Sequence, residues 1–190
     1  PLADGTSFTT LDGVERKLTQ GDLMICNEKE GMCMAGIFGG LDSGVTEKTK
    51  NIFLESACFN PVWVRKSARR HGLNTDSSFR FERGTDPNNT VYALKRAAML
   101  IKELAGGTIS SNIVDIYPSP VADFKVDVTY KGIKTLIGKD IDQSVIKNIL
   151  QSLEIRIEKE TAEGMSLLVP PYRVDVKREA DVIEEILRIY

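Results

Sequence analysis

The chain has 190 residues, a hydrophobic fraction of 42% and a formal net charge of -2. This length is enough for one large domain or two small ones. The near-neutral charge argues against a domain whose whole surface clamps nucleic acid, although a local basic surface remains possible. The sequence shows neither a signal-peptide pattern nor an apolar run of membrane-spanning length. It opens on a loop-like stretch and stops inside a helical pattern, so we expect a piece of a longer protein.

The first third of the chain is predicted to be rich in β-strands. SFTTLDG, residues 7–13, favours a strand that enters a turn. The apolar arms of residues 22–40 favour a hairpin that turns near residues 30–31. NIFLESACF, residues 51–59, favours a buried strand with Glu55 in its middle.

Residues 60–72, NPVWVRKSARRHG, carry the start and stop signals of a helix. Asn60 can cap it, Pro61 fits its first turn and Gly72 follows as a stop. A run of basic residues marks its surface, as a solvated face or a local basic pocket: Arg65, Lys66, Arg69, Arg70 and His71. We interpret His71 as a partner of the helix dipole or a phosphate contact, not as a catalytic base.

A polar segment, GLNTDSSFRFERGTDPNN, follows at residues 72–89 and is predicted to be a loop fixed by its own ion pairs. Apolar residues at helical spacing then predict a helix over residues 91–105. TISSNIVDIY, residues 108–117, favours a strand. The prolines that follow, Pro118 and Pro120, break the pattern and predict a domain boundary.

The predicted fold class is α+β, with a first domain over residues 1–117 and a smaller second domain over residues 118–190. The second domain is predicted to contain three strands and three helices. Strands are expected in FKVDVTY, IRIEKE and MSLLVPP, and helices in KGIKTLIG, DQSVIKNILQSLE and READVIEEILRIY.

The three cysteines, Cys26, Cys33 and Cys58, form neither a disulfide framework nor a CxxC metal pattern. Buried free thiols in a reducing cytoplasm are the expected state. Glu55 has three possible roles. It can lie on a wet face, pair with an arginine of the polar segment, or accept a hydrogen bond from a ligand in a pocket.

Two further patterns have both a structural and a functional interpretation. GIFGG, residues 36–40, suits a plain turn or the close approach of a ligand to the main chain. Asp181, Glu184 and Glu185 share one helix face, with Asp175 on the approach to it. These acids suit a Mg²⁺ site, or a set of carboxylates placed favourably near a helix N-terminus.

Two stretches resemble the bacterial phenylalanyl-tRNA synthetase β subunit, in order and over essentially the whole chain. They are MAGIFGGLDSGVTEKTKNIFLESACFNPVWVRKSARRHGLNTDSSFRFERGTDP and PPYRVDVKREADVIEEILRIY. The resemblance implies that the first domain is the C-terminal portion of a tRNA-editing domain. It implies that the second is the small domain after it, with a helical motif like those that bind nucleic acid.

The resemblance also implies site residues. Gly39, Glu55, Thr75 and Ser77 match positions of a pocket that hydrolyses tyrosine mistakenly attached to tRNA(Phe), where Glu55 reads the tyrosine hydroxyl. Many members of the family carry alanine where this chain has Ser77. Four acids match a magnesium site shared with the catalytic α subunit: Asp175, Asp181, Glu184 and Glu185.

The parent enzyme implied by this resemblance is an ATP-dependent ligase of the cytoplasm, an α2β2 heterotetramer that binds tRNA(Phe). Its ATP site and its ligase active site lie outside this chain, and we assign no catalytic residue here. In the family, a preceding segment with a His-Ala-Phe-Asp-type motif also contributes to the editing pocket, and this sequence does not contain it, so we expect the isolated piece to be inactive. The alternative function is a non-catalytic scaffold or an RNA-contacting module.

Overall fold

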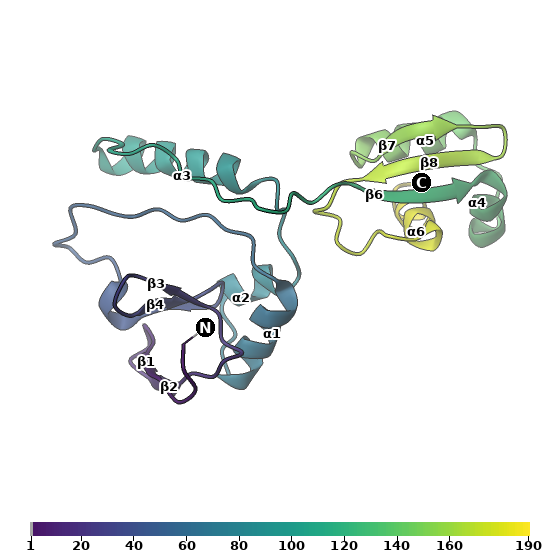
Figure 1. Cartoon of the computed structure of the whole chain (residues 1–190). Coiled ribbons are helices and arrows are strands. Elements are labelled where there is room, and N and C mark those ends of the chain that lie inside the picture. The colour runs from purple at the N-terminus through teal and green to yellow at the C-terminus, as the bar shows by residue number, and fades with distance from the viewer. Residues whose placement is uncertain (1) are drawn as a thin grey trace. The chain divides into compact units, whose positions relative to one another are not determined.

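The computed structural model describes residues 2–190 and divides the chain into two compact units, which join between Ile116 and Tyr117 (Figure 1). Each unit combines helices with small antiparallel sheets, so the predicted α+β class agrees with the structure. Within the described residues, none of the helices is both long and apolar enough to cross a membrane.

Unit 1 contains two separate small sheets. In the first, β1 pairs with β2, and in the second the order is β3-β4-β5. Its elements are β1 (Ser7–Thr9), β2 (Glu15–Lys17), β3 (Met24–Cys26), β4 (Gly31–Met34), β5 (Phe38–Gly39), the 3-10 helix η1 (Leu41–Ser43), α1 (Pro61–Arg70), α2 (Asp76–Phe81) and α3 (Thr90–Ala105). The predicted first strand and the predicted hairpin near residues 30–31 are confirmed.

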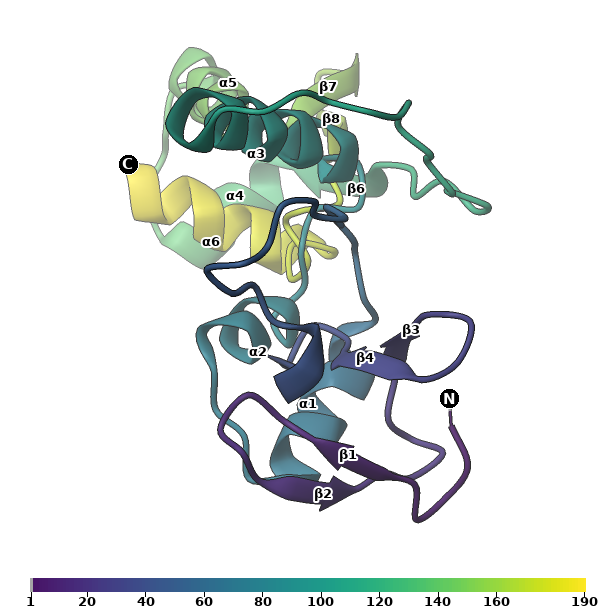
Figure 2. The same cartoon turned by 90° about the vertical axis from the view of Figure 1, so that its left-hand side faces the viewer.

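The core of unit 1 joins both sheets to α1, which runs beside the two hairpins in Figure 2. Its buried apolar residues are Phe8, Leu18, Met34, Ile37, Val64 and Ala68. The helix forms where its sequence signals predict. The Asn60 side chain accepts hydrogen bonds from the backbone N–H groups of the first turn, and Gly72 has a φ of 63°.

Three predictions for unit 1 are wrong. Residues 51–59 and 108–117 form no strand, because neither segment has a neighbouring strand to pair with among residues 2–190. The polar segment is not a continuous loop, since α2 occupies its middle. Of its predicted ion pairs, the described residues form one, between Arg83 and Glu82 at 3.0 Å.

Helix α3 is confirmed, and it ends at Gly106, whose φ is 71°. None of its side chains is buried in the described part of the chain. The cysteines also differ from expectation. All three are free, but Cys26 and Cys58 are exposed and Cys33 is half-buried.

Unit 2 is a three-stranded antiparallel sheet with the strand order β6-β8-β7, and three helices gather against it (Figure 1). Its elements are β6 (Phe124–Thr129), α4 (Tyr130–Ile137), α5 (Gln143–Ser152), β7 (Arg156–Glu160), β8 (Gly164–Val169) and α6 (Glu179–Ile189). Each lies where the sequence predicts it. The nucleic-acid-binding character of the helices stays a prediction.

Apolar and polar side chains alternate along the strands, so the apolar side chains all point to one face of the sheet. The helices pack against that face. In β6, Val126 and Val128 are buried while Asp127 between them is exposed. Helix α6 places Val182, Ile183 and Ile186 in the same core. Leu187 and Tyr190, toward the C-terminal end of this segment, are 51% exposed.

Candidate functional site

The hairpin formed by β4 and β5 leaves little space beside its main chain. Gly39 in β5 pairs directly with Cys33 in β4. A Cβ atom at Gly39 would lie 3.0 Å from the Leu11 Cδ1 atom, and one at Gly40 would lie 2.7 Å from the carbonyl oxygen of Met32. Close packing of neighbouring groups therefore accounts for both glycines.

Thr75 ties the start of α2 to the turn that leads into β5. Its hydroxyl donates to the carbonyl oxygen of Ile37 at 2.7 Å and accepts from the backbone N–H of Ser78 at 3.0 Å. The Ser78 hydroxyl completes a capping box by accepting from the Thr75 N–H. Ser77 lies in the first turn of α2 and is half-buried.

Glu55 lies in an irregular segment, and its side chain is exposed. The carboxyl still loses part of its hydration, because burial raises the pKa of Glu55 above its usual range. Among residues 2–190, neither an arginine nor any other side chain bonds to it or pairs with it. Glu55 therefore lies on a solvent-exposed face, as one of its three predicted roles required, and not inside a buried strand.

The same hairpin lies within electrostatic reach of Glu55. Burial, with the nearby Glu55 charge as a second cause, raises the pKa of the Cys33 thiol to about 11. Gly39 pairs with Cys33 within the β4–β5 hairpin, and Thr75 bonds to the carbonyl oxygen of Ile37 just before β5, so these two predicted residues both lie at the hairpin. Glu55 acts on the hairpin through its charge, which is the second cause of the raised pKa of Cys33.

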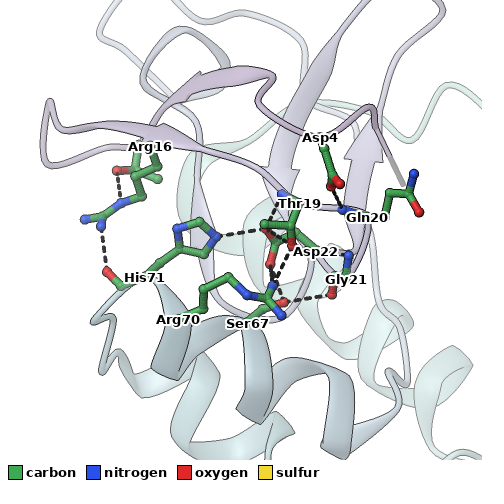
Figure 3. Close-up of polar contacts among 10 residues, drawn as sticks. Asp4, Arg16, Thr19, Gln20, Gly21, Asp22, Ser67, Arg70 and His71 are labelled. Atoms are coloured by element: carbon green, nitrogen blue, oxygen red, sulfur yellow. Dashed lines mark hydrogen bonds and ion pairs between the residues drawn. The ribbon is translucent and has the colours of Figure 1, made fainter.

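A second cluster, which the sequence analysis missed, centres on Asp22 (Figure 3). Its carboxylate is fully buried and lies 2.7 Å from Arg70 Nη1 and 2.9 Å from His71 Nε2. The Ser67 hydroxyl donates to it at 2.6 Å, and the Thr19 N–H donates at 2.8 Å. Burial opposes ionisation, but the hydrogen bonds outweigh it and lower the pKa of Asp22.

This Asp22 cluster fastens the chain before β3 to α1. His71 is therefore a structural partner of Asp22, and its side chain is 7% exposed and directed inward. The spacing of Ser67, Arg70 and His71, at i, i+3 and i+4 of one helix, is the signal that could have indicated a shared partner. The sequence gives no indication that the partner is Asp22.

In unit 2, arginines engage two of the four acids proposed for magnesium. Arg178 bonds to Asp181 at 2.7 Å and, with the nearby backbone N–H groups, lowers the pKa of Asp181 to about 2. Glu185 lies 2.8 Å from Arg173 and 3.0 Å from Arg188.

The other two acids, Asp175 and Glu184, are exposed. Over residues 2–190, no three His, Cys, Asp or Glu side chains are grouped so that they could hold a metal ion. The magnesium site that the resemblance implies, shared with an α subunit, stays a prediction.

Comparison with known proteins identifies both parts of the chain. Residues 2–106 match the family described as the B3/4 domain, and residues 126–190 match the tRNA synthetase B5 domain. The chain belongs to the B3/4 domain family. The Glu55 region and the Asp22 cluster both lie in its B3/4 domain, and the four acids lie in its B5 domain.

Whole-chain relatives agree with this assignment. The chain is 65% identical over 189 residues to a phenylalanine–tRNA ligase beta subunit of Bacteroides fragilis. This alignment covers 100% of the chain and 23% of the relative. It is 57% identical over 190 residues to that of Porphyromonas gingivalis, with the same two coverages. The chain therefore spans about a quarter of the length of these relatives, and the predicted resemblance is confirmed.

Proposed function

We propose that this chain contributes to tRNA charging as part of a phenylalanine–tRNA ligase, and that its B3/4 domain helps to remove tyrosine attached to tRNA(Phe). The observation that supports the proposal is that Gly39 and Thr75 lie at the β4–β5 hairpin and that the unpaired charge of Glu55 acts on Cys33 of the same hairpin. The proposed partners are tRNA(Phe) and a catalytic α subunit, and ATP is used elsewhere in the parent enzyme.

The chemistry of discrimination supports a carboxylate at this place. Phenylalanine and tyrosine differ by one hydroxyl group, and a site that bonds the hydroxyl rejects the analogue that lacks it. In the proposed site, Glu55 accepts the hydrogen bond of the tyrosine hydroxyl. With phenylalanine bound, the carboxylate loses that partner while the ring still covers it, which disfavours phenylalanine.

Hydrolysis needs a different contribution. His71 is committed to the buried carboxylate of Asp22, so it is not free to act as a base beside the hairpin. The proposed reaction instead relies on a water molecule and on hydroxyl groups of the substrate, which binding holds in a reactive arrangement.

The test is hydrolysis of Tyr-tRNA(Phe) and Phe-tRNA(Phe) by the native, full-length protein with Glu55→Ala. We expect the preference for the tyrosyl ester to fall by roughly 10- to 100-fold, the scale of one lost hydrogen bond to a charged group. Glu47→Ala provides a matched control, because Glu47 is also exposed and lies in the same irregular stretch. An unchanged preference in Glu55→Ala would show that Glu55 does not read the hydroxyl.

A further inference from the structure

The run of basic residues on α1 divides into two groups in the structure. The buried residues of this helix define its inner face: Val64, Ser67 and Ala68. With 3.6 residues per turn, three exposed cations fall on the opposite side. We call them the basic face of α1: Arg65, Lys66 and Arg69.

The charges of the basic face are uncompensated. In the part of the chain that the structure describes, no hydrogen bond or ion pair engages these three side chains. The other two members of the run, Arg70 and His71, are bonded to Asp22 instead. Residues 61–72 contain no Asp or Glu that could neutralise the face locally. Its positive charge is therefore available to an anionic partner.

An exposed aromatic ring flanks the basic face. Trp63, the only tryptophan of the chain, is 50% exposed and lies one turn before Lys66. Cations beside an accessible aromatic ring are the combination that proteins use on single-stranded nucleic acid, where phosphates pair with the cations and a base stacks on the ring.

We propose that the basic face of α1 binds the sugar-phosphate backbone of an RNA strand, with Trp63 available for a base or ribose. The identity of the strand as aminoacyl-tRNA rests on the proposed function. Arg65 and Arg69 are one helical turn apart, about 6 Å along the axis, which is the scale of neighbouring phosphates on a strand. Each guanidinium can bond to a phosphate through two parallel N–H groups.

The experiment measures tRNA binding by the native, full-length protein at several salt concentrations. Its variant combines Arg65→Gln, Lys66→Gln and Arg69→Gln. We expect binding of a tRNA(Phe) transcript to weaken about 10- to 100-fold at 0.1 M salt, and the slope of log K against log salt to become shallower by about 2. The charge-preserving variant Arg65→Lys, Lys66→Arg and Arg69→Lys is expected to keep that slope.

A matched control removes the same charge from another helix of the B3/4 domain. Lys95→Gln, Arg96→Gln and Lys102→Gln change three exposed cations of α3 and are expected to affect binding by less than about threefold. If both triple variants weaken binding equally, the effect is one of general charge and the proposal is overturned. Thermal unfolding of every variant shows whether a loss of tRNA binding comes from misfolding. If the glutamine variant is misfolded, tRNA binding by the charge-preserving variant tests the proposal instead.

Other outcomes distinguish this proposal from the proposed function. Normal tRNA binding by the glutamine triple variant, with loss of a protein partner or of binding to anionic vesicles, would overturn the RNA assignment and leave the editing proposal intact. Conversely, weakened tRNA binding by the triple variant, together with an unchanged Glu55→Ala preference, would support the RNA surface and reject the editing role. Trp63 fluorescence in the 190-residue chain is expected to be quenched by tRNA and to respond less in the triple variant.

Discussion

The imidazole Nε2 atom of His71 lies 2.9 Å from a carboxylate oxygen of Asp22, and both side chains are buried. This pair connects α1 to the chain that precedes β3. Arg70 and Ser67 bond to the same carboxylate, so α1 supplies three of its partners (Figure 3). The Asp22 cluster therefore holds α1 in the orientation that exposes its basic face.

Replacing Asp22 should strongly destabilise the B3/4 domain. Asp22→Ala leaves His71 and Arg70 without their buried partner, and we expect a loss of about 3 kcal/mol in the free energy of unfolding. Chemical denaturation followed by circular dichroism measures it. Asp42→Ala is the matched control, because Asp42 is exposed and is expected to change stability by less than about 0.5 kcal/mol. A comparable loss in both variants would contradict the role of the Asp22 cluster.

The same carboxylate should make stability depend on pH. The hydrogen bonds of Asp22 lower its folded-state pKa against the opposing effect of burial. Its contribution is therefore complete above the unfolded value, about 4, and is lost as the pH falls through the folded-state pKa. Between pH 5 and pH 2, the free energy of unfolding should fall more steeply in the wild type than in Asp22→Asn. Parallel pH profiles would exclude this linkage.

Thr75 should matter through its hydroxyl group. Thr75→Val keeps the shape of the side chain but removes both the N-cap of α2 and the bond to the carbonyl oxygen of Ile37. We expect a loss of about 1–2 kcal/mol in the free energy of unfolding and faster hydrogen exchange at the Ser78 amide. Thr75→Ser retains the hydroxyl and should recover most of the loss. If Thr75→Val keeps the wild-type stability while Thr75→Ser loses it, methyl packing and not capping is responsible.

The reactivity of Cys33 can report on the distance between the hairpin and Glu55. Burial and the Glu55 charge raise the pKa of Cys33 to about 11, so few thiolates exist near neutral pH. With Cys26 and Cys58 replaced by serine, Glu55→Gln should lower the pKa of Cys33 and raise its alkylation rate at pH 9 roughly threefold. Glu47→Gln should leave the rate unchanged. Equal rates in the two variants would place Glu55 away from the hairpin.

The candidate site was only partly predictable. The resemblance to the synthetase family indicated Gly39, Glu55 and Thr75. Gly39 and Thr75 lie at the β4–β5 hairpin, whereas the place of Glu55 in a shared site stays a prediction. The setting of Glu55 was not predicted correctly, because an apolar run alone does not reveal whether a second strand is present to pair with it. The burial of His71 beside Asp22 was also missed, since no local pattern links residues 49 positions apart.

The sequence by itself determined the elements whose signals are local. Asn60 caps its helix as predicted, and the alternating apolar residues of β6 identify its buried face. Tertiary structure alone decided which extended segments are strands and which basic residues at the end of α1 pair with the buried Asp22. Helix caps and strand faces depend on residues a few positions apart, whereas strand pairing and the burial of a charge depend on partners that folding brings from distant parts of the chain.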